Sequence, residues 1–164
     1  MQSSVPSQTI GCIGKCTSGL SIQELDHITD NIHNTLTHST GREIFKNFLE
    51  QRGLRDNLEC LALYETCLQI ITKETNFSYS KKETTLESLI DRVQQVKKMA
   101  EDLNGVTQID LAFLIRFNEA LNSNSRTSLL SILIDTKNLC RDHLRHIHGN
   151  FKRYASEPCP MINN

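Results

Sequence analysis

The sequence has no long apolar run and no excess of charge of one sign. None of its apolar stretches reaches the roughly 18 residues that a transmembrane helix needs. The formal net charge is −1, without the basic excess that is typical of nucleic-acid binders. The opening "MQSSVPSQTIGCIGKC" lacks the charged and apolar regions of a secretory signal, and Gln2 excludes Met-Gly myristoylation. We therefore expect a cytoplasmic protein with no transmembrane segment and no nucleic-acid partner.

Motifs that carry catalysis are also missing. In "GCIGKCTS" the glycines and Lys15 do not have the spacing of a phosphate-binding loop, and HExxH does not occur. No local pattern supports a Cys-His nucleophilic pair or an acid-base pair. The chain is therefore not expected to be an enzyme, and we predict no catalytic residue and no cofactor.

One cluster leaves a metal site open. "CRDHLRHIHG" brings Cys140 and His143 to one helix face, three residues apart, where they could hold zinc with a further ligand. The second half of a structural zinc site, a CxxC or HxxxH elsewhere, is missing. The alternative interpretation is a polar helix end whose histidines and arginines offset the negative end of the helix dipole. That interpretation is favoured, with a small zinc protein kept as an alternative.

Six cysteines would allow three disulfides in a secreted protein, but without a signal peptide we expect reduced thiols. Cys60 and Cys67 stand among apolar residues of a predicted helix, where small buried thiols are expected. Cys12 and Cys16 lie in the N-terminal lead. Palmitoylation there would place the protein at a membrane surface, although unmodified thiols are favoured.

Helical periodicity dominates, and no period-2 segment competes with it. We predict an all-α, single-domain multi-helix bundle over residues 19–157, a flexible N-terminal segment at 1–18 and a flexible tail at 158–164. One helix is expected over 21–37, and a late one from about 128 to 148, ended by Gly149. Four capping boxes are predicted, at Ser21/Glu24, Thr40/Glu43, Asp56/Glu59 and Thr84/Glu87.

The stretch "GREIFKNFLEQRGLRDNLECLALYE", Gly41 to Glu65, resembles the signature of regulator of G-protein signalling (RGS) homology domains. That signature runs G-R-x-x-F-x-x-F-L, a short linker, then E-N-L-x-F-W-x-x-x-E. The segment is also similar to the homologous helical domain of G-protein-coupled receptor kinases. The match covers about 25 residues, and the helical remainder is compatible with it. The matching positions are Gly41, Arg42, Phe45, Phe48, Leu49, Asn57, Leu58 and Glu65.

The resemblance implies an RGS-like bundle of about nine short helices that binds the switch regions of an activated Gα subunit and accelerates GTP hydrolysis. In this family an asparagine at the interhelical corner enters the Gα site, and Asn57 holds that place. Arg55 and Asp56 directly precede it in the chain. Glu65 matches a supporting carboxylate. "TQID" resembles the end of the family's second contact loop, and "NFKRYAS" its closing segment, which adds Asp110 and Arg153 to the predicted partner-binding residues.

Two departures from the family concern the corner. Cys60-Leu61 replaces the family's Phe-Trp pair, so the core behind the corner is smaller. Leu54-Arg55-Asp56 replaces the usual Ser-Glu-Glu, which puts an arginine where the family carries an acid and bears on which Gα is accepted. The alternative is a non-catalytic adaptor or scaffold for another protein, whose interface would use exposed aromatic side chains. Those candidates are Phe77, Tyr79, Phe151 and Tyr154.

Overall fold

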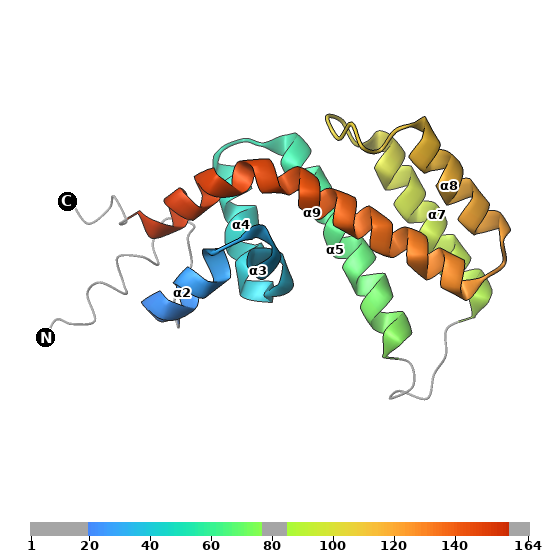
Figure 1. The fold of residues 1–164 in the computed structure, drawn as a ribbon, viewed down its shortest axis with the longest axis horizontal. Helices are drawn as coiled ribbons and strands as arrows, with labels where there is room; N and C mark the ends of the chain where they lie inside the picture. Colours follow the sequence, from blue (N-terminus) through green and yellow to red (C-terminus); the bar gives the residue numbers. More distant parts are fainter. Residues whose placement is uncertain (1–19, 77–84, 158–164) are drawn as a thin grey trace, which may run out of the picture. The chain divides into compact units, whose positions relative to one another are not determined.

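A computed structural model describes residues 20–76 and 85–157, and within these ranges it contains seven helices and no strand (Figure 1). The prediction of an all-α multi-helix fold is confirmed. The predictions for 1–18 and 158–164, and for Phe77 and Tyr79, lie outside the described residues. The helices are α2 (Ile22–Thr29), α3 (Ile32–Thr37), α4 (Ser39–Gln51), α5 (Arg55–Thr75), α7 (Leu86–Asp102), α8 (Leu111–Asn122) and α9 (Arg126–Ser156). None of the helices in these ranges is long and apolar enough to cross a membrane.

The described residues form two compact units. The first unit contains the chain up to Leu58 and again from Leu144, and the second unit is Glu59–His143. The boundary between them falls inside α5 and inside α9, so each of these helices contributes residues to both units. The two units are described separately below.

The first unit begins with two short helices where a single helix over 21–37 was predicted. The capping box of Ser21 and Glu24 is present as expected and starts α2. The helix ends at Thr29, because Asn31 takes an extended conformation and its side chain accepts a hydrogen bond from the Asn34 N–H at 2.8 Å. An asparagine that binds the backbone in this way starts a new helix, α3.

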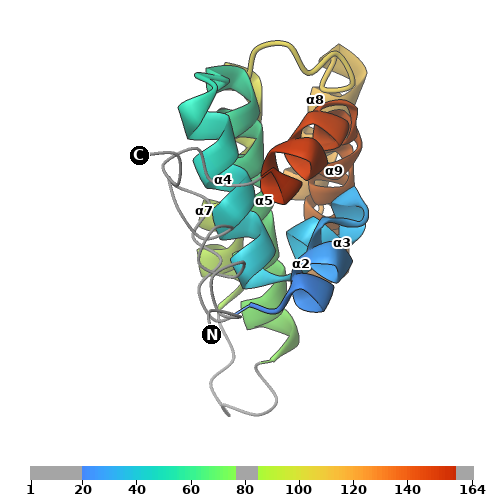
Figure 2. The same cartoon turned by 90° about the vertical axis from the view of Figure 1, so that its left-hand side faces the viewer.

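Helices α3 and α4 are neighbours in the first unit (Figure 2), and they approach each other closely at Gly41. A Cβ atom at this position would lie 2.3 Å from the carbonyl oxygen of Thr35, so only glycine fits without movement of the backbone. Arg42 donates a hydrogen bond from Nη1 to the Leu36 carbonyl at the end of α3, at 2.8 Å. The predicted capping box of Thr40 is wrong, because α4 already begins at Ser39 and has no side-chain cap.

The C-terminal part of α9 completes the first unit. The prediction that Gly149 ends this helix is wrong, because α9 continues to Ser156. Buried aromatic side chains explain the continuation. The ring of Phe151 packs edge-on against Phe45 and Phe48, with ring centroids 4.9 and 5.7 Å apart, and Tyr154 lies 5.1 Å from Phe48. Burying these rings outweighs the helix penalty of one glycine, about 1 kcal/mol.

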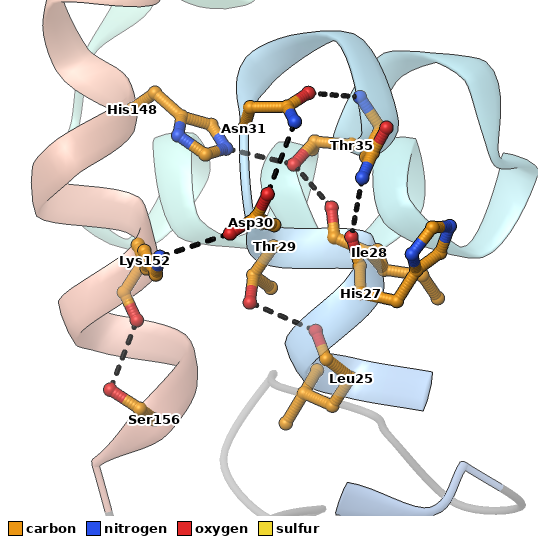
Figure 3. Close-up of polar contacts among 11 residues, drawn as sticks. Leu25, His27, Ile28, Thr29, Asp30, Asn31, Thr35, His148, Lys152 and Ser156 are labelled. Atoms are coloured by element: carbon orange, nitrogen blue, oxygen red, sulfur yellow. Dashed lines mark hydrogen bonds and ion pairs between the residues drawn. The ribbon is translucent and has the colours of Figure 1, made fainter. Parts of the chain in front are cut away.

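Polar contacts also hold α9 against α2 and α3 within this unit (Figure 3). Buried His148 lies with Nε2 2.8 Å from the hydroxyl of Thr35, which donates to the Ile28 carbonyl at 2.7 Å. On the surface, Lys152 forms an ion pair with Asp30 at 3.6 Å. The interior contact is the stronger constraint, because exposed ion pairs contribute little.

The second unit contains α7, α8 and parts of α5 and α9. Helices α7 and α8 are neighbours and run in opposite directions, joined by residues 103–110, in which Gly105 has φ +80° (Figure 1). Helix α7 is capped by Thr85, one residue after the predicted Thr84. The core takes side chains from all four helices: Leu61, Leu63 and Cys67 of α5, Leu89, Val93 and Val96 of α7, Phe113 and Phe117 of α8, and Leu129, Leu133 and Cys140 of α9.

Candidate protein-binding site

The corner between α4 and α5 is built by a glycine-based helix stop. Gly53 has φ +66°, the left-handed conformation that L side chains rarely adopt. The Leu54 N–H bonds to the Leu49 carbonyl at 3.0 Å, and the Gly53 N–H bonds to the Glu50 carbonyl at 3.1 Å. These two bonds form a Schellman motif, which satisfies the last carbonyl groups of α4. The predicted stop at Gly53 is confirmed, and the chain turns directly into α5.

The first turn of α5 presents three polar side chains. Arg55 and Asp56 are exposed, and Asn57 is half-buried and so remains partly accessible. The predicted capping box of Asp56 with Glu59 is wrong, because α5 begins one residue earlier, at Arg55, and Asp56 lies inside the first turn. A carboxylate in this position still interacts favourably with the positive end of the helix dipole.

Aromatic packing supports the corner from within the first unit. Arg52, the last residue before Gly53, places its guanidinium 5.3 Å from the ring centre of Phe48 and 5.9 Å from that of Tyr154. The Tyr154 hydroxyl donates to Gln51 Oε1 at 3.1 Å. Burial raises the pKa of Tyr154, while the charge of Arg52 opposes that shift, so the phenol stays protonated at neutral pH. The end of α4 is therefore fixed by α9.

The remaining predicted residues lie in different places. Glu65 is half-buried on α5, about two turns after Asn57. Asp110 is the N-cap of α8, where its carboxylate accepts a hydrogen bond from the Phe113 N–H at 2.9 Å. Arg153 is exposed on α9 and donates to Asn150 at 2.8 Å. Glu65 and Asp110 belong to the second unit, and Arg153 belongs to the first, with the corner.

Two of the four aromatic side chains that were predicted for an adaptor interface, Phe151 and Tyr154, are buried. Phe151 and Tyr154 are 0% and 5% exposed, because they fill the core against α4. These two residues therefore cannot form an adaptor interface, and Phe77 and Tyr79 lie outside the described residues.

Cys140, a candidate zinc ligand in the alternative interpretation, is buried in the core. It is 0% exposed, and its contact with Cys60 together with its burial strongly raises the pKa of its thiol. Among the described residues, no group of three His, Cys, Asp or Glu side chains could hold a metal ion. Burial also raises the pKa of the Cys67 thiol to about 12. As predicted, Cys60 and Cys67 are buried, and neither forms a disulfide. These thiols are poor nucleophiles and poor metal ligands.

One group of exposed apolar side chains was not singled out in the sequence. Leu111 and Ile115 of α8 and Ile134 of α9 are exposed, and a groove lies between these two helices. The signal was present in "IDLAFLIRFNEAL", which holds more large apolar residues than one buried helix face can accommodate.

No protein-family model, curated protein or solved structure matches this chain.

Proposed function

We propose that the chain is a protein-binding helical domain of the RGS type, which binds the switch regions of a Gα subunit and accelerates GTP hydrolysis. The observation that carries the proposal is the position of Asn57, a partly accessible residue in the first turn of α5, directly after the glycine-based stop of α4. An amide can donate and accept hydrogen bonds at once, so it can orient a switch side chain without adding charge.

The rigidity of the corner supports this role. The Schellman motif fixes the backbone before Asn57, and the contacts of Arg52 with Phe48 and Tyr154 fix the end of α4. Acceleration of this kind needs groups that already stand in the geometry that the transition state requires, because reorganisation during the reaction costs free energy. The domain would supply no nucleophile, and the chemistry would stay in the Gα site.

Arg55 gives the corner its own electrostatic character. Its exposed side chain comes directly before Asp56 and three residues after Arg52 in the chain. The family carries an acidic residue at the position of Arg55. A guanidinium at this position favours a partner surface with carboxylates. We therefore expect the domain to act on a restricted set of Gα subunits.

The test is single-turnover GTP hydrolysis by a panel of purified Gα subunits, with and without the protein. We expect acceleration for at least one subunit, and we expect Asn57→Ala to reduce it by roughly a hundredfold, which is the typical effect of removing one preorganised hydrogen-bonding group. Binding should be much tighter when Gα carries GDP with a transition-state mimic than with GDP alone.

A matched variant separates this effect from a general loss of structure. Asn118→Ala removes an exposed amide from α8, and we expect it to leave the acceleration unchanged. Circular dichroism of both variants should show wild-type helix content. Unchanged hydrolysis rates across the whole panel, or equal sensitivity to the two substitutions, would count against the proposal.

A further inference from the structure

A groove lies between α8 and the first half of α9, entirely inside the second unit. It consists of two open hollows of about 480 and 360 Å³ that share Arg116. Arg116 forms an ion pair with Asp135 across the groove, so the two helices are linked at its centre. The larger hollow is lined by Asp110, Ala112 and Phe113 of α8 and by Asn138, Leu139 and Asp142 of α9.

The two helices that form the groove also carry three exposed apolar side chains. The exposed fractions are 74% for Leu111, 48% for Ile115 and 41% for Ile134. Residues four apart lie next to each other on a helix, so Ile115 is beside Glu119, which lines the smaller hollow, and Leu111 lies one turn before Ile115 on the same face of α8. On α9, Ile134 lies one turn before Asn138, which lines the larger hollow. Among the described residues, the only other large apolar side chain with comparable exposure is Ile22. Three of these four exposed side chains thus belong to the two helices that form the groove.

The groove carries more acidic than basic groups. Four carboxylates, those of Asp110, Glu119, Asp135 and Asp142, stand along it, against the guanidinium groups of Arg116 and neighbouring Arg141.

Two further cations in the first half of α9, Arg126 and Lys137, are engaged with α5. Arg126 binds the buried carboxylate of Glu74 at 2.7 Å, and the Lys137 ammonium lies 5.7 Å from the ring centre of Tyr64. These contacts direct both positive charges toward α5, and the groove keeps a net negative character.

We propose that this groove binds a basic amphipathic helix of a partner protein. Its apolar face would cover Leu111, Ile115 and Ile134, and its lysine or arginine side chains would meet the carboxylates along the groove. The segment from Asp135 to Asp142 is about two turns, or about 10 Å, long, which suits a short helix laid against α8 and α9. The four-residue spacing of Leu111 and Ile115 is also the spacing of the ridges that interlock between packed helices.

This docking surface does not depend on the function proposed for Asn57. None of the residues Arg55–Asn57 takes part in it, so it would remain if the protein had no effect on GTP hydrolysis. The acidic character of the groove also argues against an anionic membrane surface or a nucleic acid as its occupant.

The probe for the test is a fluorescent 14-residue peptide that places leucines on one helical face and lysines on its flanks. The control is the same peptide with every lysine replaced by glutamate. Binding to the full chain is followed by fluorescence anisotropy. We expect saturable binding of the basic peptide, and binding of the acidic peptide that is at least about tenfold weaker.

Two variants with matched controls locate the binding. The double variant Leu111→Ala/Ile115→Ala should weaken the basic peptide at least about tenfold, whereas Ile22→Ala, which removes an equally exposed apolar side chain from α2, should not. Asp142→Lys should weaken the basic peptide and favour the acidic one. Asp91→Lys makes the same change of net charge on an exposed position of α7 and should leave the preference unaltered.

Several results would overturn the proposal. They are the absence of saturable binding, a preference for the acidic peptide, and binding that is indifferent to both groove variants. A concentration-dependent dimer in analytical ultracentrifugation that is lost in Leu111→Ala/Ile115→Ala would identify a second copy of the chain as the occupant, which also contradicts it.

Discussion

His148 shows how one buried histidine is held in a single protonation state. The hydroxyl of Thr35 has one proton, which it donates to the Ile28 carbonyl at 2.7 Å. The Nε2 atom of His148, 2.8 Å from the same hydroxyl, must therefore carry a proton and donate it. A second proton on Nδ1 would create a charge in an apolar environment. The structure consequently stabilises the neutral ring (Figure 3).

This arrangement predicts a pH dependence of stability. Burial lowers the pKa of His148 from its ordinary value of 6.5, Lys152 lowers it further, and Asp30 acts in the opposite direction. Above pH 6.5 the ring is neutral in both the folded and the unfolded chain. As pH falls through 6.5, the unfolded chain binds the proton first, so the free energy of unfolding decreases until the lower folded pKa is passed.

The variant His148→Gln isolates this contribution, because glutamine keeps an N–H donor for Thr35 and does not titrate. As pH is lowered from 7.5 to about 5, we expect the free energy of unfolding of the wild type to fall relative to that of His148→Gln. Urea denaturation of both proteins measures this change. A difference that stays constant, or grows in favour of the wild type, would contradict a depressed folded pKa.

At the scale of elements, Gly41 determines how closely α3 and α4 pack. A methyl group at this position would meet the Thr35 carbonyl oxygen at 2.3 Å and Ile28 Cγ2 at 2.8 Å, and the carbonyl cannot rotate away. We expect Gly41→Ala to lower the free energy of unfolding by about 1–3 kcal/mol, the usual cost of overpacking, despite the better helix propensity of alanine. The shift of the urea midpoint measures this loss.

Gly149 offers the matched control. It lies inside α9, and a Cβ atom there would have no neighbour within 4 Å. Gly149→Ala should therefore raise the free energy of unfolding by about 0.5–1 kcal/mol, because only the backbone preference changes. Tolerance of Gly41→Ala would mean that the contact between α3 and α4 is looser than the structure describes. Destabilisation by Gly149→Ala would mean that the space around Gly149 in α9 is not open.

The same helices show what the sequence can reveal about the fold. The capping box of Ser21 and Glu24 and the stop at Gly53 depend on residues that are close in the chain, and both were predicted. The continuation of α9 beyond Gly149 depends on Phe151 and Tyr154 packing against a helix about 100 residues earlier. Local helix propensity does not depend on residues so distant in the chain, so the predicted end of α9 was wrong.

The candidate sites follow a similar division. Gly41 and Arg42 were singled out by their place in a motif, and the structure gives each a local reason: close packing against Thr35 and a hydrogen bond to the Leu36 carbonyl. The groove of α8 and α9 could not be predicted from residue types alone. Whether Leu111 and Ile115 are core or surface depends on which face of α8 meets its neighbours, and that is settled only in three dimensions.

At the scale of the whole molecule, two helices belong to both compact units. Helix α5 passes from the first unit to the second, and α9 passes back. A helix propagates cooperatively, because each added residue gains a hydrogen bond while a new nucleus is costly. Unfolding of one unit would leave long unpacked ends on both helices. We therefore expect the two units to unfold together, in one transition.

A pair of equivalent substitutions tests this expectation. Ile44 in the first unit is 0% exposed and Ile132 in the second is 3% exposed, and replacing either by valine removes one buried methylene. Each should lower the free energy of unfolding by about 0.5–1.5 kcal/mol. If the chain unfolds as one cooperative body, each variant shifts the whole helical signal in urea, and hydrogen exchange protection falls in both units. If each variant instead moves only one of two separate transitions, α5 and α9 do not couple the units.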